Sequence, residues 1–309
     1  MRDKIRRSWL LVPMSQEARL ARAPQSGADV VVLDLVEFVA EASKPAARDR
    51  VQAALDPVQA GGAEVFTQVD AELLYADLHA CVWPGLRGVI ISRLEAPAQM
   101  AEAEALVSQL EAQRGLLPGT VEIVAGLETA RGNHEAYDIG TASQRLSGMT
   151  LGRADLIMDL RPEPSGEIHL MPYLMQRLIT VARALGVPPI GAWWRAPDRG
   201  LLAPPEPTYQ AAVRGRAIGF TGALCVLDTQ VEPLNRGFTP TAAAVETARQ
   251  LLAAYTAGVE RGMAVVEVGD RLLDRGTAVQ AQRVMDLAAA CAARDQVKAA
   301  VAAHIPLPQ

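Results

Sequence analysis

The chain has 309 residues, of which 50% are hydrophobic and 21% are charged, and its formal net charge is −5. Such a chain can bury a large core, and its length does not require two domains because α/β barrels reach this size. The negative charge balance argues against a general nucleic-acid binder, which needs a basic surface, so we expect a small-molecule partner.

The cysteines and the hydropathy pattern indicate a cellular location. Cys81, Cys225 and Cys291 lie far apart, and an odd number without metal-ligand spacing predicts no disulfide framework. The basic N-terminus leads through a short apolar run into a charged helix rather than to a cleavage site. No segment approaches the roughly 18 apolar residues of a membrane span. We therefore expect a soluble, cytoplasmic protein without a membrane partner.

Short apolar runs alternate with helical segments along the first 240 residues. The runs that predict strands are Trp9–Val12, Val30–Leu35, Val65–Val69, Gly88–Ser92, Val121–Leu127, Met149–Leu151, Ile190–Trp194 and Ala223–Leu227. Most are continuous rather than alternating, which is typical of parallel strands covered on both faces. Eight such strand–helix units predict an α/β fold, a (β/α)8 TIM barrel over residues 1–240. A doubly wound open sheet is the alternative, weakened because no strand precedes a glycine-rich phosphate fingerprint.

The pattern changes after the eighth predicted strand. A helix over Thr241–Ala257 is followed by Met263–Leu273, which alternates like a hairpin, and by a helix from about Thr277 to Ala303. Residues 241–309 are therefore expected to form a C-terminal helix–hairpin–helix extension. Its apolar residues lie beyond a complete barrel and need a partner surface, either the chain's own barrel or a neighbouring subunit. We expect a homo-oligomer in which the extension packs across a subunit boundary.

Acidic side chains follow most of the predicted strands. In a barrel of this kind the chemistry takes place where the strands end on their C-terminal side. These ends carry Asp34 with Glu37, Gln68 with Asp70, Arg93 with Glu95, Glu128, Asp155 with Asp159, Arg195 with Asp198, and Asp228. Any one acid could simply cap the following helix. Their coincidence predicts a strongly anionic barrel mouth unless a cation is bound.

Glu128 and Asp155 are the leading candidates for metal ligands. Each closes an apolar run, and a helical segment separates the two runs. If the strands are parallel neighbours about 4.8 Å apart, both carboxylates reach one point, where hard oxygen ligands suit Mg²⁺. The alternative is that both acids are helix caps or solvated loop residues.

The lysines narrow the reaction class. The chain contains only Lys4, Lys44 and Lys298, none of them on a predicted strand. A Schiff-base mechanism therefore has no well-placed amine, and carbanion chemistry would need a metal ion instead. The sequence also lacks a G-x-S-x-G elbow and an H-E-x-x-H pair.

Seven stretches occur in a consistent order from about Arg7 to the end of the chain. They read RSWLLVP, SGADVVVLDLVE, KPAAR, WPGLRGVIISR, GLETARG, LGRADL and QVEPLNRGFTP. Together they resemble the citrate lyase beta-subunit family, which includes malyl-CoA and citramalyl-CoA lyases and belongs with the metal-dependent pyruvate aldolases. The resemblance implies a Mg²⁺-dependent lyase that forms a homotrimer or a multiple of one.

The resemblance also implies roles for residues around the predicted metal pair. The acid of the E-T-A-R-G motif, Glu128, and the acid of the G-x-x-D motif, Asp155, match the family's Mg²⁺ ligands. The backbone of the turn formed by Gly152, Arg153 and Ala154 would face the carboxylate of a bound keto or hydroxy acid. The positions of the strand ends and the resemblance therefore both predict Glu128 and Asp155 as metal ligands.

Further roles implied by the resemblance lie outside this turn. Lys44 and Arg48 are candidate contacts for the phosphates of CoA, and solvated charges on a helix face are nearly as good an explanation. Asp274 matches an aspartate that reaches a neighbouring subunit's site in the lyases and is a proposed acid/base. Its alternative role is to cap the final helix.

The sequence departs from the family at the end of the third strand. The usual R-V-N reads Gln68, Val69 and Asp70, so the arginine that polarises the substrate carbonyl is replaced by a glutamine. An amide cannot reproduce the charge-assisted bonds of a guanidinium, and Arg93 or Arg153 could substitute for it. With Asp274, we count Gln68 and the second-strand residues Asp34 and Glu37 as candidate catalytic residues.

Three functional hypotheses remain open. The first is a Mg²⁺-dependent lyase that cleaves a 3-hydroxyacyl-CoA of the malyl-CoA or citramalyl-CoA type, with the metal holding the resulting enolate. The second is a pyruvate-type aldolase acting on a non-thioester hydroxy acid. The third, suggested by Gln68, is a paralogue that binds a ligand without turnover.

Overall fold

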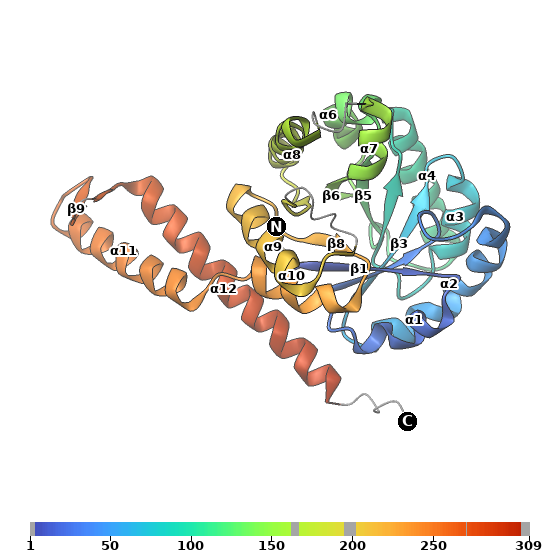
Figure 1. The fold of residues 1–309 in the computed structure, drawn as a ribbon, viewed down its shortest axis with the longest axis horizontal. Helices are drawn as coiled ribbons and strands as arrows, with labels where there is room; N and C mark the ends of the chain where they lie inside the picture. Colours follow the sequence, from blue (N-terminus) through green and yellow to red (C-terminus); the bar gives the residue numbers. More distant parts are fainter. Residues whose placement is uncertain (1–3, 162–166, 195–201, 270, 304–309) are drawn as a thin grey trace. The chain divides into compact units, whose positions relative to one another are not determined.

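Eight parallel strands form the centre of the computed structural model, which describes residues 4–161, 167–194, 202–269 and 271–303 (Figure 1). The strands are β1 (Ser8–Pro13), β2 (Val30–Asp34), β3 (Glu64–Asp70), β4 (Gly88–Ser92), β5 (Glu122–Leu127), β6 (Leu146–Leu151), β7 (Pro189–Ile190) and β8 (Ala223–Cys225). Their order is β7-β6-β5-β4-β3-β2-β1-β8, and a parallel bridge joins Ile190 to Gly222 beside β8. The sheet is therefore a nearly closed barrel, which confirms the predicted fold class.

Helices follow the strands and surround this barrel (Figure 1). They are α1 (Glu17–Arg22), α2 (Lys44–Gln59), α3 (Leu74–Cys81), α4 (Pro97–Gln113), α5 (Ala130–His134), α6 (Ala136–Thr141), α7 (Arg153–Leu160), α8 (Glu167–Ala184), α9 (Pro205–Ile218) and α10 (Val231–Phe238). In α2 the buried residues Ala47, Val51, Ala54 and Val58 recur every three or four positions. Such a stripe gives a helix one apolar face, which here belongs to the main core.

The inside of the barrel is filled by side chains from alternate strand positions. This inner cluster consists of Trp9, Leu11, Val30, Val32, Phe66, Ile90, Val124, Ile190 and Val226. The rings of Trp9 and Phe66 meet edge to face, with centroids 4.9 Å apart. Gly88 makes room for this pair, because a Cβ there would lie 2.4 Å from Cε1 of Phe66. A barrel packed in this way is not a pore, so its chemistry is confined to the mouth.

The seventh strand is shorter than the sequence predicts. The apolar run suggested a strand over Ile190–Trp194, whereas β7 ends at Ile190. After that residue the N–H of Gly191 donates to the carbonyl of Gly222 (2.7 Å), and the N–H of Trp193 donates to the carbonyl of Ala211 in α9 (3.1 Å). Because the backbone of Trp193 bonds to a helix, the chain leaves the sheet there.

A second compact unit comprises Thr239–Ala300. Its elements are α11 (Ala242–Glu260), the antiparallel hairpin of β9 (Val266–Val268) and β10 (Arg271–Leu273), and α12 (Arg275–Ala302). Thr241 caps α11, since its side chain accepts the N–H of Ala244. None of the helices in the described part of the chain combines the length and the apolar character needed to cross a membrane. The packing of this unit against a neighbouring subunit stays a prediction.

Candidate functional site

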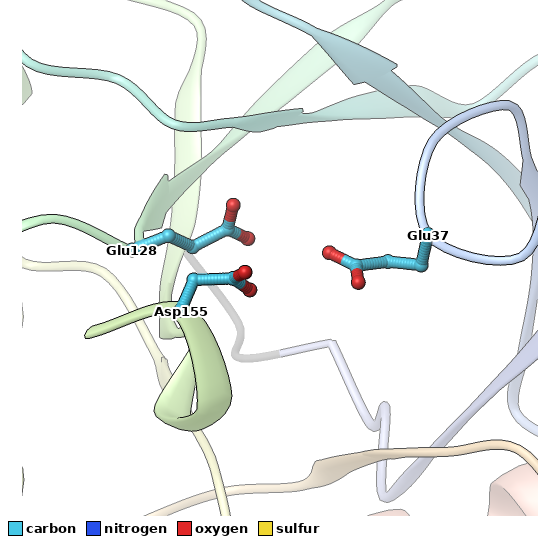
Figure 2. Close-up of side chains that lie close together, drawn as sticks. All are labelled: Glu37, Glu128 and Asp155. Carbon is cyan, nitrogen blue, oxygen red and sulfur yellow. The ribbon is translucent and has the colours of Figure 1, made fainter. Parts of the chain in front are cut away.

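Three carboxylates meet at the C-terminal mouth of the barrel. Glu37 lies in the loop after β2, Glu128 directly follows β5, and Asp155 lies in the first turn of α7, after β6. One oxygen from each residue lies within 4.8 Å of the other two. Figure 2 shows Glu128 and Asp155 side by side, with Glu37 reaching toward them from the opposite side. The three acids therefore surround one small space.

The pairing of β5 with β6 places Glu128 beside Asp155. The two strands are parallel neighbours, and Leu127 lies opposite Leu151 in their register. Gly152 then lets the Glu128 side chain pass, because a Cβ at Gly152 would lie 2.2 Å from Cγ of Glu128. The two strands are adjacent and parallel as assumed from the sequence, with Glu128 directly after β5 and Asp155 four residues after the end of β6.

Asp34 holds the loop that carries Glu37. Its carboxylate is fully buried and accepts the backbone N–H groups of Val36 (2.8 Å), Glu37 (3.0 Å) and Phe38 (2.9 Å). Such side-chain bonds to the backbone fix a tight turn. Asp34 therefore positions Glu37, and its bonds give no support to the catalytic role predicted for it.

Glu128 is buried in a network that orients its carboxylate. Its side chain is 5% exposed, and Oε2 accepts the backbone N–H of Arg93 at 3.1 Å. The hydroxyl of Ser92 also donates to it, and Nε2 of Gln68 donates to that hydroxyl oxygen at 2.7 Å. Gln68 therefore acts on Glu128 through Ser92.

The three carboxylates repel one another because they lie close together and are partly withdrawn from water. Burial raises the pKa of Glu128 to about 8, and repulsion by Glu37 and Asp155 adds to this rise. Glu37 keeps some exposed surface, yet desolvation is also the largest cause that raises its pKa to about 7, followed by repulsion from Asp155 and Asp34. Groups that suppress each other's ionisation in this way are ready to share a bound cation.

The residues present fit a hard divalent cation. Octahedral Mg²⁺ holds its oxygen ligands at about 2.0–2.1 Å, so ligands on opposite sides lie about 4.2 Å apart. The observed limit of 4.8 Å exceeds this by less than about 1 Å, a difference that a small side-chain movement removes. Glu37, Glu128 and Asp155 could thus hold one ion and leave positions for water and substrate.

Lys44 and Arg48 take part in ion pairs near the mouth. Lys44 is buried, and its Nζ lies 2.5 Å from Glu41 and 3.9 Å from Asp70. Nε of Arg48 donates to Asp77 at 2.7 Å. These contacts support a structural role for both cations, and their predicted contact with CoA phosphates stays a prediction.

The turn predicted to bind the substrate carboxylate forms the start of α7. Gly152 is the N-cap residue, and Arg153 and Ala154 are the first two residues of the helix. The first N–H groups of a helix have no partner within it, and they favour anions. The side chains of Arg153 and Ala154 lie outside what the structure describes, as do Arg195 and Asp198.

Asp274 lies at the start of α12 in the second unit. Its Oδ1 accepts the backbone N–H of Thr277 (2.8 Å) and the Thr277 hydroxyl (2.9 Å). These bonds lower the pKa of Asp274, which is fully exposed. The structure therefore shows the helix cap that was its alternative role, and action in a neighbouring subunit stays a prediction.

Two functional features were missed by the sequence analysis. Ser92 was not singled out, although a serine at the end of a buried strand is a recognisable signal. The sequence placed Asp70 and Arg93 at neighbouring strand ends, but it did not show that they form an ion pair. That contact depends on the backbone of the loop after β4.

The fold and the site define a class of protein: a TIM barrel whose mouth can hold a divalent cation through three carboxylates. Residues 7–227 match the sequence profile of the HpcH/HpaI aldolase/citrate lyase family, and the chain belongs to this family. The family is one of lyases related to the beta subunit of citrate lyase.

Individual relatives extend along nearly the whole chain. The citrate lyase subunit beta of Leuconostoc mesenteroides subsp. cremoris is 28% identical over 291 residues, covering 93% of this chain and 94% of that protein. The (3S)-malyl-CoA thioesterase of Cereibacter sphaeroides strain ATCC 17029 is also 28% identical, with coverages of 93% and 96%. The structure resembles CitE from Mycobacterium tuberculosis in complex with magnesium, acetoacetate and coenzyme A, with a TM-score of 0.71, 25% identity and coverages of 91% and 97%.

Proposed function

We propose that the protein is a Mg²⁺-dependent carbon–carbon lyase that cleaves a 3-hydroxyacyl-CoA of the malyl-CoA or citramalyl-CoA type. The observation that carries the proposal is the meeting of Glu37, Glu128 and Asp155 at the barrel mouth. The magnesium and coenzyme A bound to the M. tuberculosis relative support both the metal and the substrate class. The products would be a 2-oxo acid and an acyl-CoA.

Each side chain of the site has a separate task in this proposal. Glu37, Glu128 and Asp155 would hold Mg²⁺, which when bound stabilises the negative charge that develops on substrate oxygen as the carbon–carbon bond breaks. Ser92 and the N–H of Arg93 orient Glu128. The N–H groups at the start of α7 lie next to Asp155 and suit the substrate carboxylate.

A substrate panel tests the proposed reaction. Purified protein would be incubated with malyl-CoA, citramalyl-CoA and the corresponding free hydroxy acids, with either Mg²⁺ or a chelator. We expect release of a 2-oxo acid from a thioester, at least about 100-fold faster with Mg²⁺, because the metal supplies several kcal/mol of charge stabilisation.

The other outcomes of the panel identify the competing functions. Faster cleavage of the free acids would indicate a pyruvate-type aldolase, and CoA release without carbon–carbon cleavage would indicate a thioesterase like the C. sphaeroides relative. Absence of Mg²⁺-dependent exchange of substrate α-protons would contradict catalysis and indicate a binding paralogue. Gln68 is the feature that favours the binding paralogue.

We further propose a homo-oligomer, a trimer or a multiple of one, in which Asp274 serves a neighbouring subunit as acid/base. A carboxylate near the reacting oxygen or α-carbon can move the proton that cleavage requires. Mixing Asp274→Asn protein with Glu128→Gln protein should restore a fraction of the activity that neither variant has alone. Absence of recovery, despite demonstrated subunit exchange, would rule out action between subunits.

A further inference from the structure

We propose that Arg93 binds the anionic oxygens of the substrate at the barrel mouth, and that Asp70 holds its guanidinium in place for this task. The inference rests on the proposed function, since it assigns the ligand of that same site. It names the ligand class as a small oxo acid anion, or the oxo-acid part of the thioester. The supporting observations are a backbone conformation, an ion pair, unused donors and the nearby charges.

Arg93 has an unusual backbone conformation for its residue type. Its φ is +59°, and among the described residues Arg161 is the other non-glycine residue with a positive φ. An L side chain rarely adopts this region, and such residues gather at functional sites. The conformation lets the N–H of Arg93 donate to Glu128 while its side chain reaches Asp70. One residue thus connects the carboxylate cluster to β3.

Asp70 provides a fixed anchor for the guanidinium. Its carboxylate is 1% exposed and pairs with Nη2 of Arg93. The other oxygen, Oδ1, accepts the backbone N–H of Glu72 at 3.0 Å, and Nζ of Lys44 lies 3.9 Å from Oδ2, the oxygen that Arg93 contacts. A carboxylate held from several sides restricts the rotamers of its partner, so the guanidinium is oriented before a ligand arrives.

The guanidinium keeps donors that the protein does not use. The Arg93 side chain is 41% exposed, although its Nε is buried and donates to no atom of the described residues. An arginine has five N–H donors in a planar fork that matches a carboxylate. Nη2 pairs with Asp70 and lies 3.9 Å from the exposed carboxylate of Glu72, and the exposed end of the guanidinium is left for a ligand.

The charge of Arg93 acts on the carboxylate cluster itself. It interacts electrostatically with Glu37 and with Glu128. In the register of β3 and β4, Asp70 lies opposite Ser92, so Arg93 follows this pair directly. The neighbouring Gln68 is 3% exposed and carries no charge. Arg93, directly after β4, therefore supplies a partly exposed positive group on this side of the mouth, whereas the nearby Lys44 is buried, and an oxo acid anion beside the carboxylate cluster would meet Arg93.

The test compares two ligands in matched variants. Arg93→Asn keeps the backbone N–H that donates to Glu128, and asparagine tolerates a positive φ. Arg93→Lys keeps the positive charge but lacks the planar set of guanidinium donors. Arg161→Asn is the control, because Arg161 is an exposed arginine with a φ of +50° at the end of α7. Calorimetry would measure Mg²⁺ binding first, and then acetoacetate binding to the Mg²⁺-loaded protein.

The expected result separates ligand binding from a structural role. Arg93→Asn should weaken acetoacetate binding about 10- to 100-fold, the usual loss for a charged hydrogen bond. Its Mg²⁺ affinity should stay equal or increase, because a nearby positive charge is removed. The acetoacetate affinity of Arg93→Lys should lie between those of Arg93→Asn and the wild type. Arg161→Asn should match the wild type in both its Mg²⁺ and its acetoacetate affinity.

Four results would overturn the inference. If Arg93→Asn bound Mg²⁺ normally and bound acetoacetate within twofold of the wild-type affinity, the inference would be overturned and the proposed function would stand. Loss of both affinities would mean that Arg93 only supports the fold of the site. Failure of the Mg²⁺-loaded wild type to bind acetoacetate would refute the ligand class. Failure of the wild type to bind Mg²⁺ would instead overturn the proposed function, and the inference with it.

Discussion

Replacing Glu128 by glutamine is expected to remove most of the Mg²⁺ affinity and to slow the proposed lyase reaction at least about 100-fold. Loss of a group that merely supports a metal ligand typically lowers metal affinity or activity about 10- to 100-fold. Loss of a ligand itself should lower them at least as much. The substitution keeps the shape of the side chain and an oxygen for the N–H of Arg93. The loss would therefore reflect the missing charge, as measured by calorimetry with Mg²⁺ and by the substrate panel.

The same substitution is expected to stabilise the metal-free protein at pH 8. The pKa values of Glu37 and Glu128 are raised to about 7 and about 8. Between their ordinary value of about 4.5 and these values the folded chain binds more protons than the unfolded chain, so its stability falls as the pH rises. Glutamine does not titrate, which reduces this fall. Melting temperatures in chelator at pH 5 and pH 8 measure the difference.

Glu102→Gln is the matched control, because Glu102 is an exposed glutamate on α4. It should leave the Mg²⁺ affinity, the rate and the pH dependence of the melting temperature unchanged. If Glu128→Gln bound Mg²⁺ as tightly as the wild type, Glu128 would not be a ligand. A lower melting temperature at pH 8 in chelator would contradict the repulsion between the carboxylates.

Gly152→Ala is expected to weaken Mg²⁺ binding at least about tenfold and to destabilise the fold by about 1–3 kcal/mol, the usual cost of inserting a methyl group into a packed site. The backbone of Gly152 is ordinary, with a φ of −77°, so alanine fits the backbone. The added Cβ would lie 2.2 Å from Cγ and 2.9 Å from Cδ of Glu128. Glu128 must therefore move away from Asp155.

Gly148→Ala provides a control on β6, the strand that precedes Gly152. There a new Cβ would meet Cδ1 of Ile190 at 3.1 Å, which is the flexible end of a side chain. Mg²⁺ affinity should remain that of the wild type in this variant. Denaturant titration and calorimetry on both variants provide the comparison, and equal Mg²⁺ affinities would show that the position of Glu128 does not depend on Gly152.

The barrel could be predicted from the sequence because buried parallel strands leave a simple signal. The runs Val30–Leu35 and Gly88–Ser92 are continuous and apolar, and both form strands of nearly the predicted length. The run Ile190–Trp194 is also continuous and free of charged residues, yet it leaves the sheet after Ile190. Its path depends on the hydrogen bond from the N–H of Trp193 to the carbonyl of Ala211. Ala211 lies 18 residues further along the chain, and hydrophobic periodicity cannot reveal such a distant contact.

The site was predictable where it depends on strand ends and not where it depends on loops. Glu128 and Asp155 follow neighbouring strands, so their proximity results from the barrel itself. Glu37 was predicted as catalytic and lies with this pair, because Asp34 folds the loop that carries it. The sequence could not show the turn at Arg93, since only the three-dimensional structure reveals its positive φ.

A crystal of the protein soaked with Mn²⁺ gives the most direct test of the metal site at the barrel mouth. The anomalous signal of manganese locates the ion independently of the protein density. We expect one strong peak in the space enclosed by Glu37, Glu128 and Asp155, within coordination distance of at least Glu128 and Asp155. A peak at another position, or none at a saturating Mn²⁺ concentration, would contradict a metal centre at the barrel mouth.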